Sequence, residues 1–166
     1  GSFRHSNTTE MSHRIAVDAI SLELDIAKIY QKIYESSSVS RIKLLGNVIQ
    51  NLNFDCNGEL VWFALNEDMI QEVNGSNQDF DGFTDFFRSI QGVEVSVMLY
   101  DLKGKVRLSF RSKGKYKVSE IAKKMGGGGP PFAAAALVEG EFSDVKSNVL
   151  NILSTYINRH NENNIS

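Results

Sequence analysis

Apolar residues recur at helical spacing through roughly the first third of the chain, in three separate stripes. Their i, i+3, i+4 period is typical of amphipathic helices. We therefore predict that residues 8–53 are helical, with Asn7, Thr8 or Thr9 capping the first helix, Asp25 capping the second, and the serines at 36–38 ending it. The stripes are expected in the core, and they comprise Met11, Ile15, Ala19 and Ile20; Ile26, Ile29, Tyr30 and Ile33; and Val39, Ile42, Leu45, Ile49 and Leu52.

The period changes from about residue 54. Two short strands, Asn53–Cys56 and Leu60–Leu65, are expected on either side of the turn signal Asn57-Gly58. The residues that follow are predicted to form a short helix over residues 66–73 and then a polar loop over residues 74–78. A further helix is expected to begin at Asp79 or Asp81, with Phe83, Phe86 and Phe87 facing inward.

Strict alternation of apolar and polar residues then predicts a β-hairpin around a turn at Asp101–Gly104. Its apolar positions are Val93, Val95, Val97 and Leu99, followed by Val106, Leu108 and Phe110. The alternate positions place Lys105, Arg107, Ser109 and Arg111 on the other face of the second strand. After the hairpin we expect a short helix over Val118–Met125 that ends at Gly126, a strand over Ala133–Val138, a final helix capped by Ser143, and a polar tail.

These elements predict an α/β chain, in which N-terminal linker helices precede a mixed β-sheet domain flanked by helices. We place the helices in residues 1–52, the sheet domain in residues 53–160 and the polar tail in residues 161–166. The chain has 166 residues, of which 42% are hydrophobic and 23% charged, as in ordinary globular proteins. No apolar run approaches the ~18–20 residues of a membrane helix, so no membrane contact is expected.

Two further features favour a cytoplasmic protein. Residues 1–10 lack the apolar stretch of a secretory signal. The single cysteine, Cys56, argues against a disulfide framework and against a cysteine-rich zinc site, and it fits a reducing compartment.

The formal net charge of −2 hides an uneven distribution of charge. Residues 103–124 hold nine basic side chains and one acid, Glu120, a local balance of +8 against −10 for the rest of the chain. Such concentration suggests an anionic ligand bound at one place, with a solvated basic face as the alternative. The basic residues are Lys103, Lys105, Arg107, Arg111, Lys113, Lys115, Lys117, Lys123 and Lys124.

A run of four glycines, Gly126–Gly129, is the strongest candidate for ligand chemistry. Glycine lets the main chain approach a ligand closely, and consecutive N–H groups can form an anion-binding nest. The run is followed by Pro130-Pro131, so it matches neither the GxxxxGK[ST] loop nor a GxGxxG turn that opens a helix. A flexible linker is the alternative interpretation.

The end of the basic strand supplies the side chains that would complete a phosphate site. Arg111 offers a planar fork suited to phosphate and Ser112 adds a hydroxyl. Phe132 can stack on a base, or it packs in the core. The candidate substrate-binding residues are Arg111, Ser112, Lys113, Gly126, Gly127, Gly128, Gly129 and Phe132.

The segments VEVSVMLYDLKGKVRLSFRSKGKYKVSEIAKKMGGGG and AAAALVEGEF resemble the C-terminal, DHH-associated domain of the DHH phosphoesterase superfamily. Its hallmark is a strand that ends in SxRS, a short helix, and then GGGGH-x-x-AAG. The segments AKIYQKIYES and FTDFFRSIQGVEVSVMLY resemble the inter-lobe helices and domain entry of its nanoRNase/pAp-phosphatase branch, which is RecJ-like. The opening GSFRHSNTT resembles the end of the catalytic DHH lobe.

The resemblance implies that this chain is the substrate-binding half of a split enzyme. The family's other lobe holds two Mn²⁺ ions through Asp and His motifs that this sequence lacks, so no catalytic or metal-binding residue is expected here. The implied partners are short RNA or nucleotide phosphates and the DHH lobe, and a homodimer is left open. The implied parent activity is manganese-dependent hydrolysis of short oligoribonucleotides or of 3′,5′-bisphosphorylated adenosine (pAp).

One departure from the family pattern leaves alternatives open. Pro130 replaces the family histidine after the glycines, and Ala135 replaces the last glycine of the motif. A non-catalytic nucleotide- or RNA-binding module derived from the family is therefore a second hypothesis. A tRNA-contacting domain like that of alanyl-tRNA synthetase is a third.

Overall fold

The computed structural model describes Phe3 and residues 8–163, which divide into two units, residues 1–38 and residues 39–166. The opening segment that resembles the end of a DHH lobe lies mostly outside the described residues, as does Asn7. Thr9 is the N-cap of the first helix and the Asp25 carboxylate accepts the Lys28 N–H at 2.9 Å, so both predicted caps are confirmed.

The first unit contains helices α1 (Glu10–Ser21) and α2 (Ile26–Tyr34), and neither helix has a buried residue. The prediction that their apolar stripes are core is therefore wrong for this chain. Ile15 and Ile20 of α1 are 61% and 65% exposed, and Ile33 of α2 is 63% exposed. The stripes have the right spacing, but two short helices offer too little apolar surface to bury one another.

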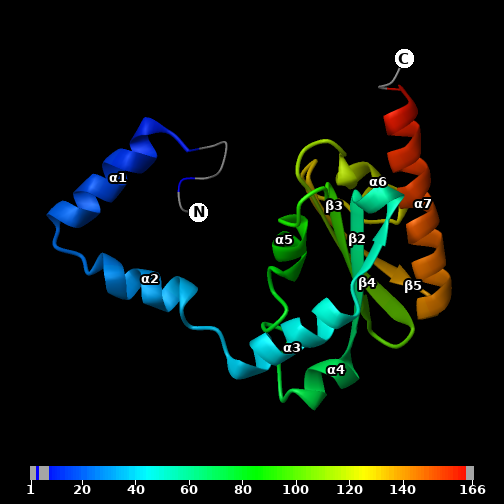
Figure 1. Ribbon diagram of the computed structural model, residues 1–166, viewed down its shortest axis with the longest axis horizontal. Helices are drawn as coiled ribbons and strands as arrows, with labels where there is room; N and C mark the ends of the chain where they lie inside the picture. The colour runs from blue at the N-terminus through cyan, green and yellow to red at the C-terminus, as the bar shows by residue number, and fades with distance from the viewer. Residues whose placement is uncertain (1–2, 4–7, 164–166) are drawn as a thin grey trace. The chain divides into compact units, whose positions relative to one another are not determined.

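The second unit is a mixed five-stranded sheet with helices on both faces (Figure 1). The strand order follows the sequence, and the β2–β3 pair is parallel whereas the other three pairs are antiparallel. The elements are α3 (Val39–Gln50), β1 (Asn53–Asp55), the 3₁₀ turn η1 (Cys56–Gly58), β2 (Leu60–Asn66), α4 (Glu67–Glu72), α5 (Phe83–Arg88), β3 (Val95–Asp101), β4 (Lys105–Ser112), α6 (Val118–Lys124), β5 (Ala133–Glu139) and α7 (Phe142–Asn163). The predicted α/β class is confirmed.

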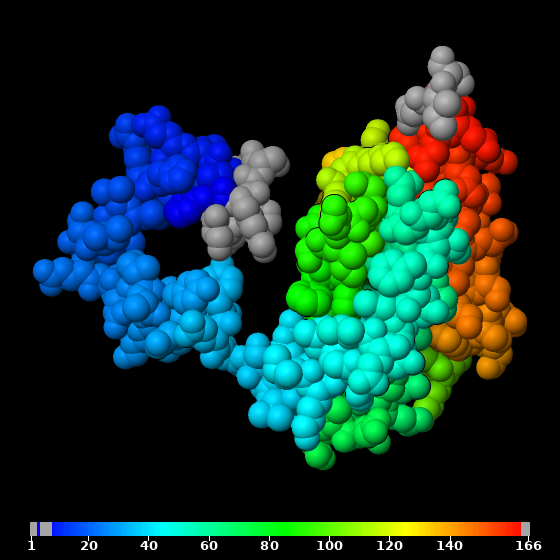
Figure 2. Space-filling view, viewed as in Figure 1, coloured from blue at the N-terminus to red at the C-terminus, as the bar shows by residue number. Residues whose placement is uncertain are grey.

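Each face of the sheet has its own apolar core. Helices α6 and α7 cover one core, which includes Leu108, Phe110 and Val149. Helices α3, α4 and α5 lie over the other, which includes Phe63 and Phe87. The atoms of residues 39–163 form one packed body (Figure 2). Because β3 runs between two helical layers, it is buried on both faces over most of its length. Its alternation of apolar and polar residues therefore does not identify a solvent-exposed face.

Four apolar residues of α3 and α5 that were predicted to be buried are exposed. The stripe predicted for α3 is exposed at Val39, Ile42 and Ile49, while Leu44 and Val48 are buried instead. In α5, Phe83 and Phe87 are buried but Phe86 is 50% exposed. The packing of α3 on the sheet also starts the compact unit at Val39, whereas the sequence suggested residue 53.

The last helix extends beyond the predicted boundary, through Asn163, into the segment assigned to a polar tail. The Glu59 carboxylate at the start of β2 holds this end of the helix. Its Oε2 accepts a hydrogen bond from the Tyr116 hydroxyl and one from Asn161 Nδ2, each at 2.7 Å. The Lys115 ammonium pairs with Oε1. A side-chain network thus fixes a turn of helix that has few apolar residues of its own.

Candidate functional site

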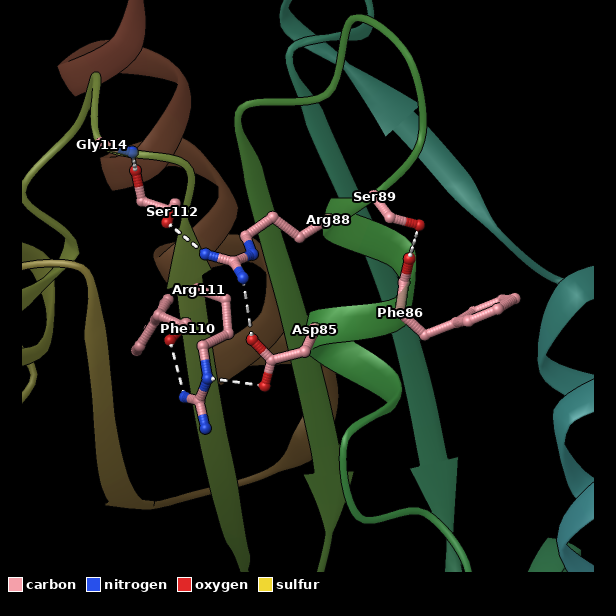
Figure 3. A network of polar contacts seen from close by, with 8 residues as sticks. All are labelled: Asp85, Phe86, Arg88, Ser89, Phe110, Arg111, Ser112 and Gly114. Carbon is pink, nitrogen blue, oxygen red and sulfur yellow. Dashed lines mark hydrogen bonds and ion pairs between the residues drawn. The ribbon is translucent and has the colours of Figure 1, made fainter. Parts of the chain in front are cut away.

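Arg111 lies at the end of β4 with part of its guanidinium group open to a ligand. Its Nε donates to Asp85 Oδ2 at 3.1 Å and its Nη1 donates to the Phe110 carbonyl at 3.0 Å (Figure 3). No acceptor among the described residues takes a hydrogen bond from Nη2. Both N–H groups of Nη2 and one of Nη1 therefore remain available side by side, which is the arrangement that binds two oxygens of a phosphate.

Ser112 and Lys113, also predicted to bind substrate, serve the turn after β4 in this structure. Ser112 is 1% exposed, and its Oγ accepts the N–H of Gly114 at 3.1 Å and that of Tyr116 at 3.4 Å. The Lys113 ammonium donates to the Ile90 carbonyl at 2.9 Å. Both side chains brace the turn that follows Arg111 at the end of β4.

The glycine run lies against β5, the edge strand of the sheet. Gly128 and Ala135 exchange a pair of main-chain hydrogen bonds, each at 2.9 Å. The N–H of Gly126 donates to Lys123, and that of Gly127 donates to Ala122 at 2.8 Å. The first three amides of the expected nest are thus used within the protein. Among the four glycines, only the N–H of Gly129 has no acceptor in the described part of the chain.

The close packing of the run against β5 explains why its second position, Gly127, must be glycine. A Cβ on Gly127 would lie 2.1 Å from the Ala135 carbonyl oxygen and 2.6 Å from the Ala136 Cα. These contacts are with main chain that cannot move aside. The flexible-linker interpretation is wrong for this segment, because both flanking elements hold it in place.

The segment that follows the glycine run, at Phe132 and Ala133, lies beside Arg111 in the sheet. Ala133 pairs with Arg111 across β5 and β4, and the Ser112 N–H donates to the Phe132 carbonyl at 2.9 Å. Gly129 lies one strand further out, beside Ala133, so its main chain is about 10 Å from that of Arg111, or two strand spacings. Phe132 is 41% exposed, so the core-packing alternative for its ring is wrong. The main chains of Arg111, Gly129 and Phe132 therefore lie at the same corner of the sheet.

Several residues of the basic segment are paired with acids. Lys105 pairs with Glu139, Lys115 with Glu59, and Arg111 with Asp85. Arg107, four residues before Arg111 on the same face of β4, forms no ion pair with an acid among the described residues. The positive charge on this face of β4 is therefore smaller than the sequence suggests, because acids pair with Lys105 and Arg111 and leave only Arg107, among the basic residues of the strand, without an ion pair in the described part of the chain.

Neither Asp85 nor Arg88 is among the candidate site residues predicted from the sequence. Arg88 donates to the Ser112 carbonyl at 2.9 Å and lies 3.3 Å from Asp85 Oδ1, so the carboxylate lies between two guanidinium groups (Figure 3). The spacing of Asp85 and Arg88 on one helix is visible in the sequence. No sequence signal connects Asp85 to Arg111, because 26 residues separate them.

Within residues 8–163, no group of three or more histidine, cysteine, aspartate or glutamate side chains is placed to hold a metal ion. No helix among these residues is both long and apolar enough to span a bilayer.

Comparisons with known proteins identify relatives over most of the chain. Residues 61–159 match the sequence family described as the DHHA1 domain. A bifunctional oligoribonuclease and PAP phosphatase, NrnA, from Thermus thermophilus is 33% identical over 140 residues, which are 84% of this chain and 41% of that protein. The NrnA of the same description from Bacillus subtilis is 26% identical over 138 residues, which are 83% of this chain and 43% of that protein.

A solved structure has the same fold. The crystal structure of an exopolyphosphatase-related protein from Bacteroides fragilis gives a TM-score of 0.82 at 23% identity, covering 94% of this chain and 47% of that one. This chain therefore spans less than half the length of the curated relatives and the solved structure described here.

Proposed function

This chain belongs to the DHHA1 domain family, and from that premise we propose that it is the substrate-binding half of a DHH phosphoesterase that acts on short oligoribonucleotides or on pAp. The named activities of the two NrnA relatives support this choice of substrate. The observation that carries the proposal is the open donor pair of Arg111, placed at one corner of the sheet with the free amide of Gly129 and the exposed ring of Phe132.

Each of these groups has a distinct part in binding. The Nη1 and Nη2 donors of Arg111 take two oxygens of a substrate phosphate, and the Gly129 N–H takes a third acceptor. The Phe132 ring supplies an apolar plane on which a base stacks. Ser112 and Lys113 act indirectly, because they hold the loop beside Arg111.

Hydrolysis itself is not assigned to these residues. In a complete protein of this kind, Mn²⁺ in the DHH lobe would activate the attacking water. The described residues of this chain offer no ligand set for such an ion, so their proposed part is to hold and orient the phosphate.

The exposed stripes of α1 and α2 support a partner lobe. Met11, Ile15 and Ile20 of α1 and Ile29 and Ile33 of α2 are between 42% and 65% exposed. Apolar surface of this extent is stabilised when another surface covers it. We propose that the DHH lobe of the parent protein covers these helices.

Replacing Arg111 tests the site. We expect Arg111→Ala in the full chain to weaken pAp binding at least about tenfold, because hydrogen bonds to a charged group contribute roughly 1.5–3 kcal/mol. Isothermal titration of pAp into both proteins measures the change.

The matched control is Lys105→Ala, on the same strand and the same face. Lys105 lies about 20 Å along the strand from Arg111 and already pairs with Glu139. Its loss should change the affinity less than twofold. Equal affinities of wild type and Arg111→Ala would remove Arg111 from the site, and no binding by the wild type would remove the proposed function.

Hydrogen exchange tests the proposed cover over α1 and α2. In the chain alone, we expect their amides to exchange at least about 100-fold faster than those of β3 and β4, because helices shorter than about 12–15 residues are marginal in water without packing. Mass spectrometry at several protein concentrations measures the protection. Strong protection that rises with concentration would mean that a second copy of the chain covers the helices instead.

A further inference from the structure

We infer that Asp85 is a positioning residue for phosphate binding, and that its carboxylate fixes Arg111 with its open donors toward the ligand. The inference rests on the proposed function and adds to it a residue on a different element. Asp85 is in α5, Arg111 is in β4, and no feature of the sequence links them.

The geometry leaves the guanidinium group of Arg111 little freedom. Asp85 Oδ2 holds Nε from one side, and the Phe110 carbonyl holds one N–H of Nη1. These two contacts define the plane of the group and its rotation within that plane. The donors that remain free are adjacent, so a phosphate meets a fork that is already oriented and loses less side-chain entropy on binding.

Asp85 is itself held in place. Arg88, one turn later on α5, contacts the other carboxylate oxygen and also donates to the Ser112 carbonyl. Arg88 therefore ties Asp85 to the strand end that carries Arg111. The side chains of Arg88 and Arg111 are 32% and 31% exposed, so water does not fully screen the group.

The negative charge of Asp85 makes the inference testable, because the direction of the change in pAp affinity on its removal distinguishes the two possible roles. A carboxylate beside an anion site repels the ligand, so its removal should tighten binding if charge is all that matters. If Asp85 positions Arg111, its removal should weaken binding even though a repulsive charge is lost. The two roles predict opposite changes.

The experiment titrates pAp into the full chain and into Asp85→Ala and Asp85→Asn. We expect Asp85→Ala to weaken binding about fivefold, a size typical of contacting residues that act together. Asp85→Asn keeps an oxygen acceptor for Nε, so it should recover most of that loss. In an Arg111→Ala background, Asp85→Ala should change the affinity less than twofold.

Glu139→Gln is the matched control, because it removes an acid from the same face of the sheet at the far end of β5. It should leave the affinity unchanged or tighten it slightly. Tighter or unchanged binding by Asp85→Ala would overturn the inference while leaving the proposed function intact. So would a loss that persists without Arg111, since it would report general damage to the site. Absence of binding by the wild type would overturn both.

Discussion

Gly127→Ala is expected to destabilise the protein by about 3 kcal/mol or more, a large effect for the addition of one methyl group. The added Cβ would lie 2.1 Å from the Ala135 carbonyl oxygen and 2.6 Å from both the Cα and the Cβ of Ala136. All three atoms belong to β5, which pairs with β4 along its whole length. Relief therefore requires the glycine run to move off the sheet edge, with loss of the Gly128–Ala135 hydrogen bonds. Urea unfolding followed by circular dichroism measures the loss.

Gly128→Ala is the natural control, because it is the next residue and its Cβ would meet nothing within 4 Å. We expect it to cost less than about 1 kcal/mol. Gly126 should fall between the two, since its φ of +77° penalises any side chain while the space around it is open. If Gly127→Ala were no less stable than Gly128→Ala, close packing against β5 would not be the reason for glycine at this position.

Glu59→Gln is expected to lower the free energy of unfolding by about 2 kcal/mol at neutral pH. The carboxylate accepts hydrogen bonds from Lys115, Tyr116 and Asn161, and a carboxamide turns one of its two acceptors into a donor. Tyr116 is fully buried, and its single hydroxyl proton lies within reach of this carboxylate at 2.7 Å and of the Asn161 carboxamide oxygen at 2.8 Å. The exposed pair between Lys115 and Glu59 contributes less than the two hydrogen bonds beneath it.

The pH dependence of this effect has a definite sign. Burial raises the pKa of Glu59, but the hydrogen bonds from Lys115, Asn161 and Tyr116 outweigh it and hold the pKa below its ordinary value of 4.5. A carboxyl group with a lowered pKa in the folded state stabilises the protein above its unfolded pKa and loses that contribution as pH falls through the folded pKa. The difference between wild type and Glu59→Gln should therefore be full at pH 7 and should shrink below about pH 4.

Urea unfolding of wild type and Glu59→Gln at pH 7 and below about pH 4 measures the difference in free energy of unfolding, with Glu139→Gln as the control. Glu139 is 80% exposed in its pair with Lys105, so its replacement should change stability by less than about 0.5 kcal/mol. A Glu59→Gln penalty that stays constant down to acid pH would show that the shape of the side chain, and not its charge, holds the network.

The sequence predicted local structure well where one residue type has a local physical role. Asp25 caps α2 through its own carboxylate, and Asn57, with a φ of +56°, makes the turn between β1 and β2. The β3–β4 hairpin follows from alternation, and Gly126 ends α6 with a φ of +77°. These features depend on residues close together in the chain.

Hydrogen bonds from elsewhere in the fold decide which groups of the predicted ligand site are free to bind, and the sequence does not show them. Arg111 and Phe132 are both accessible, although the sequence left open whether the Phe132 ring packs in the core. Ser112 turned out to be buried, and its hydroxyl oxygen accepts hydrogen bonds from the turn that follows. The sequence shows the glycines but not the strand against which they lie.

The sequence by itself determined the α/β class, the order of the strands and helices in unit 2, and the resemblance to the DHH-associated domain. Each of these depends on spacing and residue type along the chain. Only the tertiary structure decided that α3 buries Leu44 and Val48, that Gly127 is needed for contact with β5, and that Asp85 holds Arg111. The physical reason is that burial and hydrogen bonding depend on which segments, distant in the sequence, pack against one another. The local pattern of residue types does not specify those contacts.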